Sequence, residues 1–277
     1  MTPLLTIALA LGLAGAQQEP AGPLSPEETQ LVEAMAAQDV HLDPRAGLVA
    51  IPVDVAVRDE LLEYVLVGPA GATHESLFVT PIKPSVINVA ILALGLESGQ
   101  NAAWQPIEPA PTPEELRGGA SAYSVTLPRG DVLHPYVAWR QGDDWFFYRL
   151  EDLLRNLLTG HSMQRHGWVY LGSRMIPPLP GHTQPAEPPP EEFAADVYQN
   201  LINVSFFRDG YTLVTTALTE CVEQTIWMCN PWLVPERGSR LLLVFSRERL
   251  DTLPAALAER LPIIAPDARD ARSGERR

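Results

Sequence analysis

The sequence predicts an α+β fold in a single domain, built mainly on antiparallel β-sheet with a few short helices. Short apolar, β-branched runs separated by turn residues recur along most of the chain, which is typical of strands. Helical patterns occur only at isolated points, so the sequence lacks the regular strand–helix alternation of a parallel sheet. Proline accounts for 27 of the 277 residues, which disfavours a helical bundle.

Composition and charge exclude several classes of protein. With 46% hydrophobic residues, the chain can bury a substantial core, so disorder throughout is excluded. The formal net charge of −14 argues against nonspecific binding to nucleic acid or to anionic membranes, both of which need basic surface. Most of this charge lies in segments 17–45, 105–117 and 177–196, which leaves the rest of the chain close to neutral.

The N-terminus has the pattern of a secretory signal peptide at 1–16. Residues 4–16 form an uncharged apolar run that ends in Ala14-Gly15-Ala16, a small-x-small cleavage site. The run falls short of the roughly 20 apolar residues that span a bilayer. We therefore expect an exported protein, periplasmic or extracellular, with no transmembrane segment in the mature chain.

A polar leader with a short helix is expected at 17–45. The Ser25-Pro26-Glu27-Glu28 pattern is a capping box with proline at the first helical position, and it predicts a helix to about Ala37.

The main domain is expected at 46–250. Apolar runs predict strands at 47–57 and 61–68. A third strand at 73–80 would carry His74, Ser76 and Phe78 on one face and Glu75 on the other, since side chains alternate along a strand. Proline at position 84 begins an apolar helix that runs to Leu94 and is closed by Gly95.

The second half of the domain continues the strand pattern between two proline-rich loops, at 105–117 and 177–190. Five leucines between Leu150 and Leu158 at helical spacing predict an amphipathic helix. The remaining strands are expected at 123–127, 132–140, 145–148, 167–172, 201–207, 211–217 and 241–245. A C-terminal helix at about 253–260 and a disordered tail make up 251–277.

The two cysteines, Cys221 and Cys229, leave two alternatives open. Eight residues of extended strand would separate them by about 26 Å, so a disulfide would require a turn between them. Two buried free thiols are the other alternative. Two cysteines cannot hold a four-thiolate zinc or iron–sulfur site.

The segment 74–99 contains a His-Glu-Ser strand, then Lys-Pro-Ser and an Ala/Leu-rich helix ending in Leu-Gly. In these motifs the chain resembles the YdjY-like family of bacterial exported proteins. Weaker matches are TrpValTyrLeuGlySer at 168–173, AlaAspValTyrGlnAsnLeuIle at 195–202 and ProGluArgGlySerArgLeuLeuLeu at 235–243. The resemblance spans roughly 48–246.

The resemblance implies an exported α+β domain whose activity is uncharacterised. Some relatives are associated with iron–sulfur chemistry, but this chain has no cluster motif, so no cofactor is expected. Relatives often carry histidine in the helix where this chain has Asn88.

The candidate binding residues are the polar side chains around the predicted strand-to-helix corner: His74, Glu75, Ser76, Lys83, Ser85 and Asn88. A serine nucleophile needs a nearby imidazole base, but His74 and Ser76 would lie about 7 Å apart along a strand. The alternative is that these groups hydrogen-bond one another and stabilise the corner. No metal site is expected, because no HxxxH or HExxH pattern occurs.

Three functions are compatible with these patterns. The first is an exported, non-enzymatic binding or interaction domain, with an unknown small molecule or protein as partner and no nucleic acid. The second is a hydrolase that uses His74, Ser76 and Lys83. The third, an extracytoplasmic redox accessory, rests on the family resemblance alone.

Overall fold

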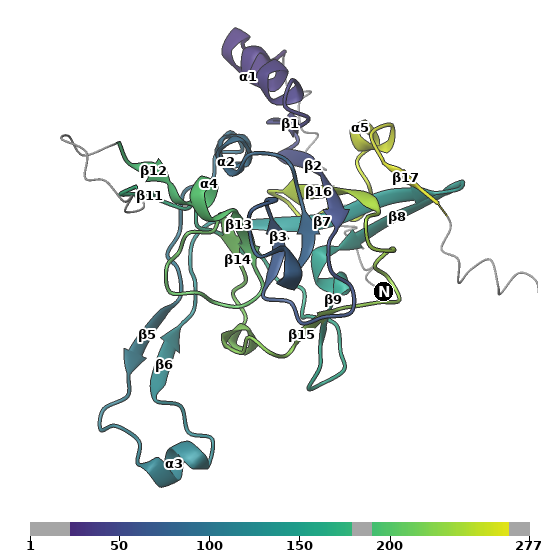
Figure 1. The fold of residues 1–277 in the computed structure, drawn as a ribbon. Coiled ribbons are helices and arrows are strands. Elements are labelled where there is room, and N and C mark those ends of the chain that lie inside the picture. Colours follow the sequence, from purple (N-terminus) through teal and green to yellow (C-terminus); the bar gives the residue numbers. More distant parts are fainter. Residues whose placement is uncertain (1–22, 179–189, 266–277) are drawn as a thin grey trace, which may run out of the picture.

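The computed structural model describes residues 23–178 and 190–265 (Figure 1). The predicted signal peptide at 1–16, most of the proline-rich segment at 177–190 and the predicted tail beyond 265 lie outside the described residues. Within the described ranges, no helix is long and apolar enough to cross a membrane.

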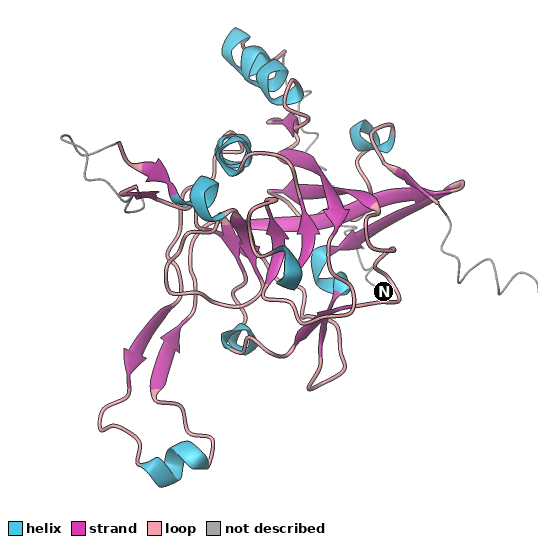
Figure 2. Ribbon diagram, viewed as in Figure 1, coloured by secondary structure: helices cyan, strands magenta, loops and turns pink. Residues whose placement is uncertain are grey.

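Eight strands close into a β-barrel (Figure 2). Neighbours around the barrel are hydrogen-bonded, and the pairing of β4 with β2 completes the circle. In order around the barrel the strands are β2 (Leu48–Val55), β16 (Arg240–Ser246), β7 (Val132–Gln141), β10 (Trp168–Tyr170), β14 (Val214–Thr215), β13 (Asn200–Asn203), β3 (Tyr64–Val67) and β4 (Ser76–Val79).

The barrel is mixed. Strands β13 and β14 pair in parallel, as do β3 and β4, and the other pairings around the barrel are antiparallel. The prediction of a single, mainly β domain with short helices is confirmed. The prediction of a simple antiparallel sheet is wrong, because the sheet closes into a barrel with two parallel pairs. Local patterns identify strands, whereas closure depends on contacts such as β2 with β16, which lie near opposite ends of the chain.

The main hydrophobic core fills the barrel. Val49 and Ile51 of β2 belong to it, whereas the alternate residues Leu48 and Ala50 belong to a second, smaller cluster. This alternation is expected of strands with one face inside a barrel and one outside. The second cluster is covered by the C-terminal segment, whose helix α5 (Ala255–Ala258) contributes Leu257.

Other elements surround the barrel. Strands β1 (His41–Asp43), β8 (Asp144–Arg149) and β17 (Ile263–Ile264) extend the barrel sheet. Three two-stranded sheets pair β5 (Ala103–Pro106) with β6 (Tyr123–Thr126), β9 (Leu154–Asn156) with β15 (Trp227–Cys229), and β11 (Met175–Ile176) with β12 (Glu192–Phe193). The short helices are α3 (Pro113–Arg117) and α4 (Ala194–Tyr198), with 3-10 turns η1 (Thr73–Glu75), η2 (Leu150–Leu153) and η3 (Thr219–Val222).

The predicted N-terminal and central helices are confirmed. Helix α1 (Pro26–Ala36) begins after Ser25, which forms the predicted capping box. Helix α2 (Pro84–Leu92) is followed by Gly95 with a φ of 77°, a backbone conformation that favours glycine.

Three local predictions are wrong. The expected helix at 150–158 is the turn η2 followed by strand β9, because Leu154 pairs with Cys229 of β15. The expected strand at 73–80 begins only at Ser76, since His74 lies in η1. The expected loop at 105–117 is part of an arm formed by β5, α3 and β6, which extends away from the barrel (Figure 1).

Candidate functional site

The predicted His74 and Glu75 lie at the surface. The His74 side chain is 78% exposed, and its Nε2 is 3.8 Å from a Glu75 carboxylate oxygen. Because both residues belong to η1 rather than to β4, the strand does not present the imidazole beside Ser76.

Ser76 is completely buried, and its hydroxyl donates a hydrogen bond of 3.0 Å to the backbone oxygen of Phe78. A hydroxyl in this state is neither accessible to a substrate nor bonded to an imidazole base. The structure therefore does not assemble the His74, Ser76 and Lys83 cluster that a hydrolase would need.

Lys83 and Ser85 are brought together by Asp196, a residue the sequence did not single out. The Lys83 ammonium lies 3.0 Å from one Asp196 carboxylate oxygen, and the Ser85 backbone N–H donates to the other at 2.8 Å. Asp196 thus joins α4 to the first turn of α2. This arrangement has the character of a structural corner, but the partner of Lys83 and Ser85 is Asp196 rather than the expected His74, Glu75 and Ser76.

Asn88 faces the barrel rather than Lys83. Its Oδ1 accepts a hydrogen bond of 2.6 Å from the Tyr170 hydroxyl of β10. Burial raises the pKa of Tyr170 to about 12, so the phenol stays protonated and donates this bond. Asn88 therefore connects α2 to a barrel strand.

Cys221 and Cys229 are free thiols, and both are buried. Cys229 donates to the backbone oxygen of Arg58 at 2.6 Å. Burial raises the pKa of each thiol to about 12. Neither is suited to act as a nucleophile or redox group, because the thiolate is the reactive form.

A different cluster has the features of a binding site. We call it the arginine pocket; its volume is about 390 Å³, and it is lined by Tyr136, Phe147, Tyr148, Arg149, Asp152, Arg165, Arg249, Leu250 and Asp251. Strands β7 and β8 supply the aromatic residues, and the segment after β16 supplies Arg249, Leu250 and Asp251. The Leu250 N–H donates to the Tyr136 hydroxyl at 2.6 Å and ties this segment to the barrel.

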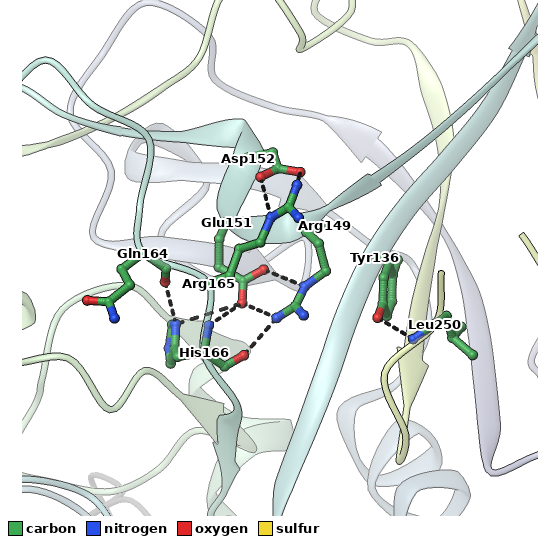
Figure 3. A network of polar contacts seen from close by, with 8 residues as sticks. All are labelled: Tyr136, Arg149, Glu151, Asp152, Gln164, Arg165, His166 and Leu250. Carbon is green, nitrogen blue, oxygen red and sulfur yellow. Dashed lines mark hydrogen bonds and ion pairs between the residues drawn. The ribbon is translucent and has the colours of Figure 1, made fainter. Parts of the chain in front are cut away.

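A buried ion pair lies behind the pocket (Figure 3). Glu151 is completely buried, and Arg149 donates to its two carboxylate oxygens from Nε at 3.1 Å and from Nη2 at 2.5 Å. The backbone N–H of His166 donates to the same carboxylate at 3.1 Å. The Arg149 Nη2 also donates to the His166 carbonyl at 2.7 Å. These bonds hold the guanidinium in one orientation.

Arg149 contributes to the pocket wall through its remaining surface. Its guanidinium carbon lies 5.4 Å from the centre of the Tyr136 ring, and in Figure 3 it lies between that ring and Glu151. None of its hydrogen bonds to the described part of the chain uses Nη1. A guanidinium oriented in this way, with a donor left over, is suited to bind an anionic group.

Two further arginines border the pocket. Arg165 donates to both oxygens of Asp152, from Nε at 2.9 Å and Nη2 at 2.8 Å. These bonds raise the pKa of Arg165 above its usual value. Arg249 is exposed and makes no hydrogen bond or ion pair within the described part of the chain. Asp251 also lines the pocket and would repel an anion placed beside it.

Aromatic rings form the apolar part of the same pocket. Tyr136 and Phe147 stack with ring centres 4.8 Å apart. Tyr148 also lines the pocket. Burial raises the pKa of its phenol, and the charge of Asp152 contributes a smaller part of the increase. In the sequence, Phe147 and Tyr148 belong to an aromatic-rich hairpin that is compatible with a ligand surface, although alternating aromatic residues are also ordinary in the core of a sheet.

Two buried histidines lie next to this network. Burial lowers the pKa of both His134 and His166; the charge of Arg149 also lowers these pKa values, whereas the charge of Glu151 opposes the shift. His166 Nδ1 is 3.0 Å from the Gln164 carbonyl, while its buried Nε2 has no hydrogen-bond partner. Both imidazoles are therefore held neutral in the folded protein near pH 7.

The sequence offered little sign of this site. Its charged residues come from positions 149–152, 165 and 249–251, which only the folded chain brings together. On the predicted amphipathic helix at 150–158, Glu151 and Asp152 would lie on the polar face as ordinary surface residues. The one local signal is a carboxylate two residues after Arg149, at the end of a strand.

Among the residues that the structure describes, no group of three or more His, Cys, Asp or Glu side chains could hold a metal ion. No protein-family model, curated protein or solved structure matches the chain.

Proposed function

We propose that this chain is an exported, non-enzymatic binding domain that holds a small organic anion in the arginine pocket. Export is supported by the signal-peptide pattern at 1–16, and kinship with the YdjY-like family by the motifs at 74–99. The main support for an organic anion as the ligand is that the pocket has three guanidiniums around stacked aromatic rings.

The charges of the pocket favour an anion at one particular place. Arg149 and Arg165 each have a carboxylate partner. Within residues 23–178 and 190–265, neither uses Nη1 in a hydrogen bond, and Arg249 has no partner. Carboxylates and phosphates accept hydrogen bonds from such planar donors in pairs. The anionic group therefore belongs among the three arginines, away from Asp251.

The aromatic rings define the rest of the ligand. A pocket of about 390 Å³ is large enough for an anionic group together with a ring or short acyl chain. Tyr136, Phe147 and Tyr148 offer apolar surface for that part. An aromatic or acyl carboxylate or phosphate matches both halves of the pocket better than an inorganic anion does.

A binding role is favoured over the two alternatives. A hydrolase based on His74 and Ser76 would need a reorganisation that exposes a fully buried hydroxyl. A redox role based on thiol chemistry would need accessible sulfur, and both thiols are buried with raised pKa values. By contrast, the arginine pocket is formed and open without any such change.

Isothermal titration calorimetry with phenyl phosphate, benzoate and benzyl alcohol tests the proposal. Phenyl phosphate and benzoate should bind saturably, and the neutral alcohol should bind much more weakly. Arg249→Gln should weaken binding of both anions about tenfold or more, since a charge-assisted hydrogen bond contributes about 1.5–3 kcal/mol.

The matched control is Arg129→Gln, which removes an exposed arginine outside the pocket. It should leave both dissociation constants unchanged. Equal affinity for benzyl alcohol and the two anions, or equal losses in the two arginine variants, would refute the proposal.

A further inference from the structure

A second pocket differs in chemistry from the arginine pocket. It has a volume of about 100 Å³ and lies where the end of α4, strand β13 and the turn before β14 meet. We call it the tyrosine pocket, after its lining by Tyr64, Tyr198, Phe207 and Tyr211, with Asn203 and Thr212.

Aromatic rings in two stacked pairs form its walls. The ring centres of Tyr64 and Phe207 are 4.9 Å apart, and those of Tyr198 and Tyr211 are 4.6 Å apart. A cation already lies on one of these rings, since the Arg174 guanidinium carbon is 4.8 Å from the centre of Tyr211. Clustered aromatic faces attract cations because their π-systems carry negative charge at the face.

Two buried side-chain oxygens that line the pocket have no hydrogen-bond partner among the described residues. They are Asn203 Oδ1 and Thr212 Oγ1, in residues that are 1% and 4% exposed, and no described residue bonds to either atom. The exposed carboxylate of Asp209 also lines the pocket. None of the lining residues is a lysine, arginine or histidine. Buried polar atoms are nearly always hydrogen-bonded, so two unpaired oxygens in one pocket indicate a missing hydrogen-bonding partner.

We propose that the tyrosine pocket binds a primary ammonium group. The aromatic faces and Asp209 favour a positive charge. A primary ammonium has three N–H donors, and both unpaired oxygens can accept from them. A volume of about 100 Å³ is that of roughly three water molecules, which suits the head of an alkylammonium rather than a whole organic ligand. The rest of the ligand would lie in solvent or on a partner, as with a lysine side chain.

Saturation-transfer difference NMR with n-butylammonium, tetramethylammonium and butanol tests this inference on the whole mature chain. n-Butylammonium should bind saturably. Butanol lacks the charge and tetramethylammonium lacks N–H donors, so the affinity of each should be lower by about tenfold or more. Equal affinity for n-butylammonium and either of the other probes would overturn the assignment.

Two variants locate the binding. Asp209→Asn removes the exposed carboxylate and should weaken n-butylammonium binding severalfold, and Thr212→Val should do the same by removing a buried acceptor. Asp143→Asn, in the exposed β7–β8 turn, is the matched control and should have no effect. Unchanged affinity in Asp209→Asn would refute the site even if Thr212→Val fails to fold. The outcome is independent of anion binding in the arginine pocket.

Discussion

Replacing Glu151 by alanine removes the carboxylate on which the wall of the arginine pocket depends. Glu151 is completely buried and Arg149 is 11% exposed, so the variant leaves a guanidinium in the interior without its counter-charge. It also leaves the His166 N–H without its acceptor. Breaking a buried pair by removing one partner costs about 3–5 kcal/mol.

This loss should be measurable by urea denaturation and by thermal unfolding. For a chain of this size, about 3–5 kcal/mol corresponds to a fall in Tm of roughly 6–20 °C. Changing both partners, in Arg149→Met with Glu151→Leu, should recover much of the loss, because no uncompensated charge then remains. Phenyl phosphate binding should not return in the double variant.

The matched control is Asp54→Ala. Arg240 donates to both Asp54 oxygens at 2.8 Å, but this pair is exposed, with side chains 52% and 29% accessible. Its loss should cost at most about 1 kcal/mol. If Glu151→Ala costs no more than Asp54→Ala, then Glu151 does not hold the site in the way described.

Other regions give further tests. Because burial lowers the pKa of His166 below its unfolded value, the unfolded chain binds more protons as pH falls below about 6.5. Stability should therefore be full above that pH and fall below it, and urea titrations at pH 7.5 and 5.5 should show a smaller loss in His166→Asn. Cys221 and Cys229 should react with iodoacetamide at pH 8 only after denaturant is added, and no reductant should be needed, since both are buried free thiols with pKa values of about 12. Mass spectrometry that shows rapid labelling of the folded chain, or a disulfide, would contradict this. Gly172→Ala should lower the thermal midpoint, because the backbone there has a φ of 73° and a Cβ would lie 2.2 Å from Ser98 Oγ; an unchanged midpoint would show that this close approach is not maintained.

Elements with strong local signals were predictable from the sequence. The capping box at Ser25 predicted the start of α1, and the proline at position 84 predicted the start of α2. The hairpin of β7 and β8 follows from two apolar runs around a turn at Gly142, whose φ is 61°. In each case the determining residues are adjacent in the chain.

Barrel closure and the candidate site were not predictable in this way. The leucines at 150–158 have helical spacing, but pairing of Leu154 with Cys229 makes that stretch a strand. The hydrolase alternative needs an accessible Ser76 near His74, but burial in the barrel commits the Ser76 hydroxyl to the backbone. Arg149, Arg165 and Arg249 form one site only because the fold brings together segments that are far apart in sequence.

A crystal structure of the chain from residue 17 onward with phenyl phosphate tests the central proposal most directly. The phosphoryl group should accept hydrogen bonds from Arg249 and from Nη1 of Arg149, with the phenyl ring against Phe147 or Tyr148. Phenyl phosphate bound elsewhere, or a pocket that stays empty at saturating concentration, would contradict the proposal that this barrel is an anion-binding domain.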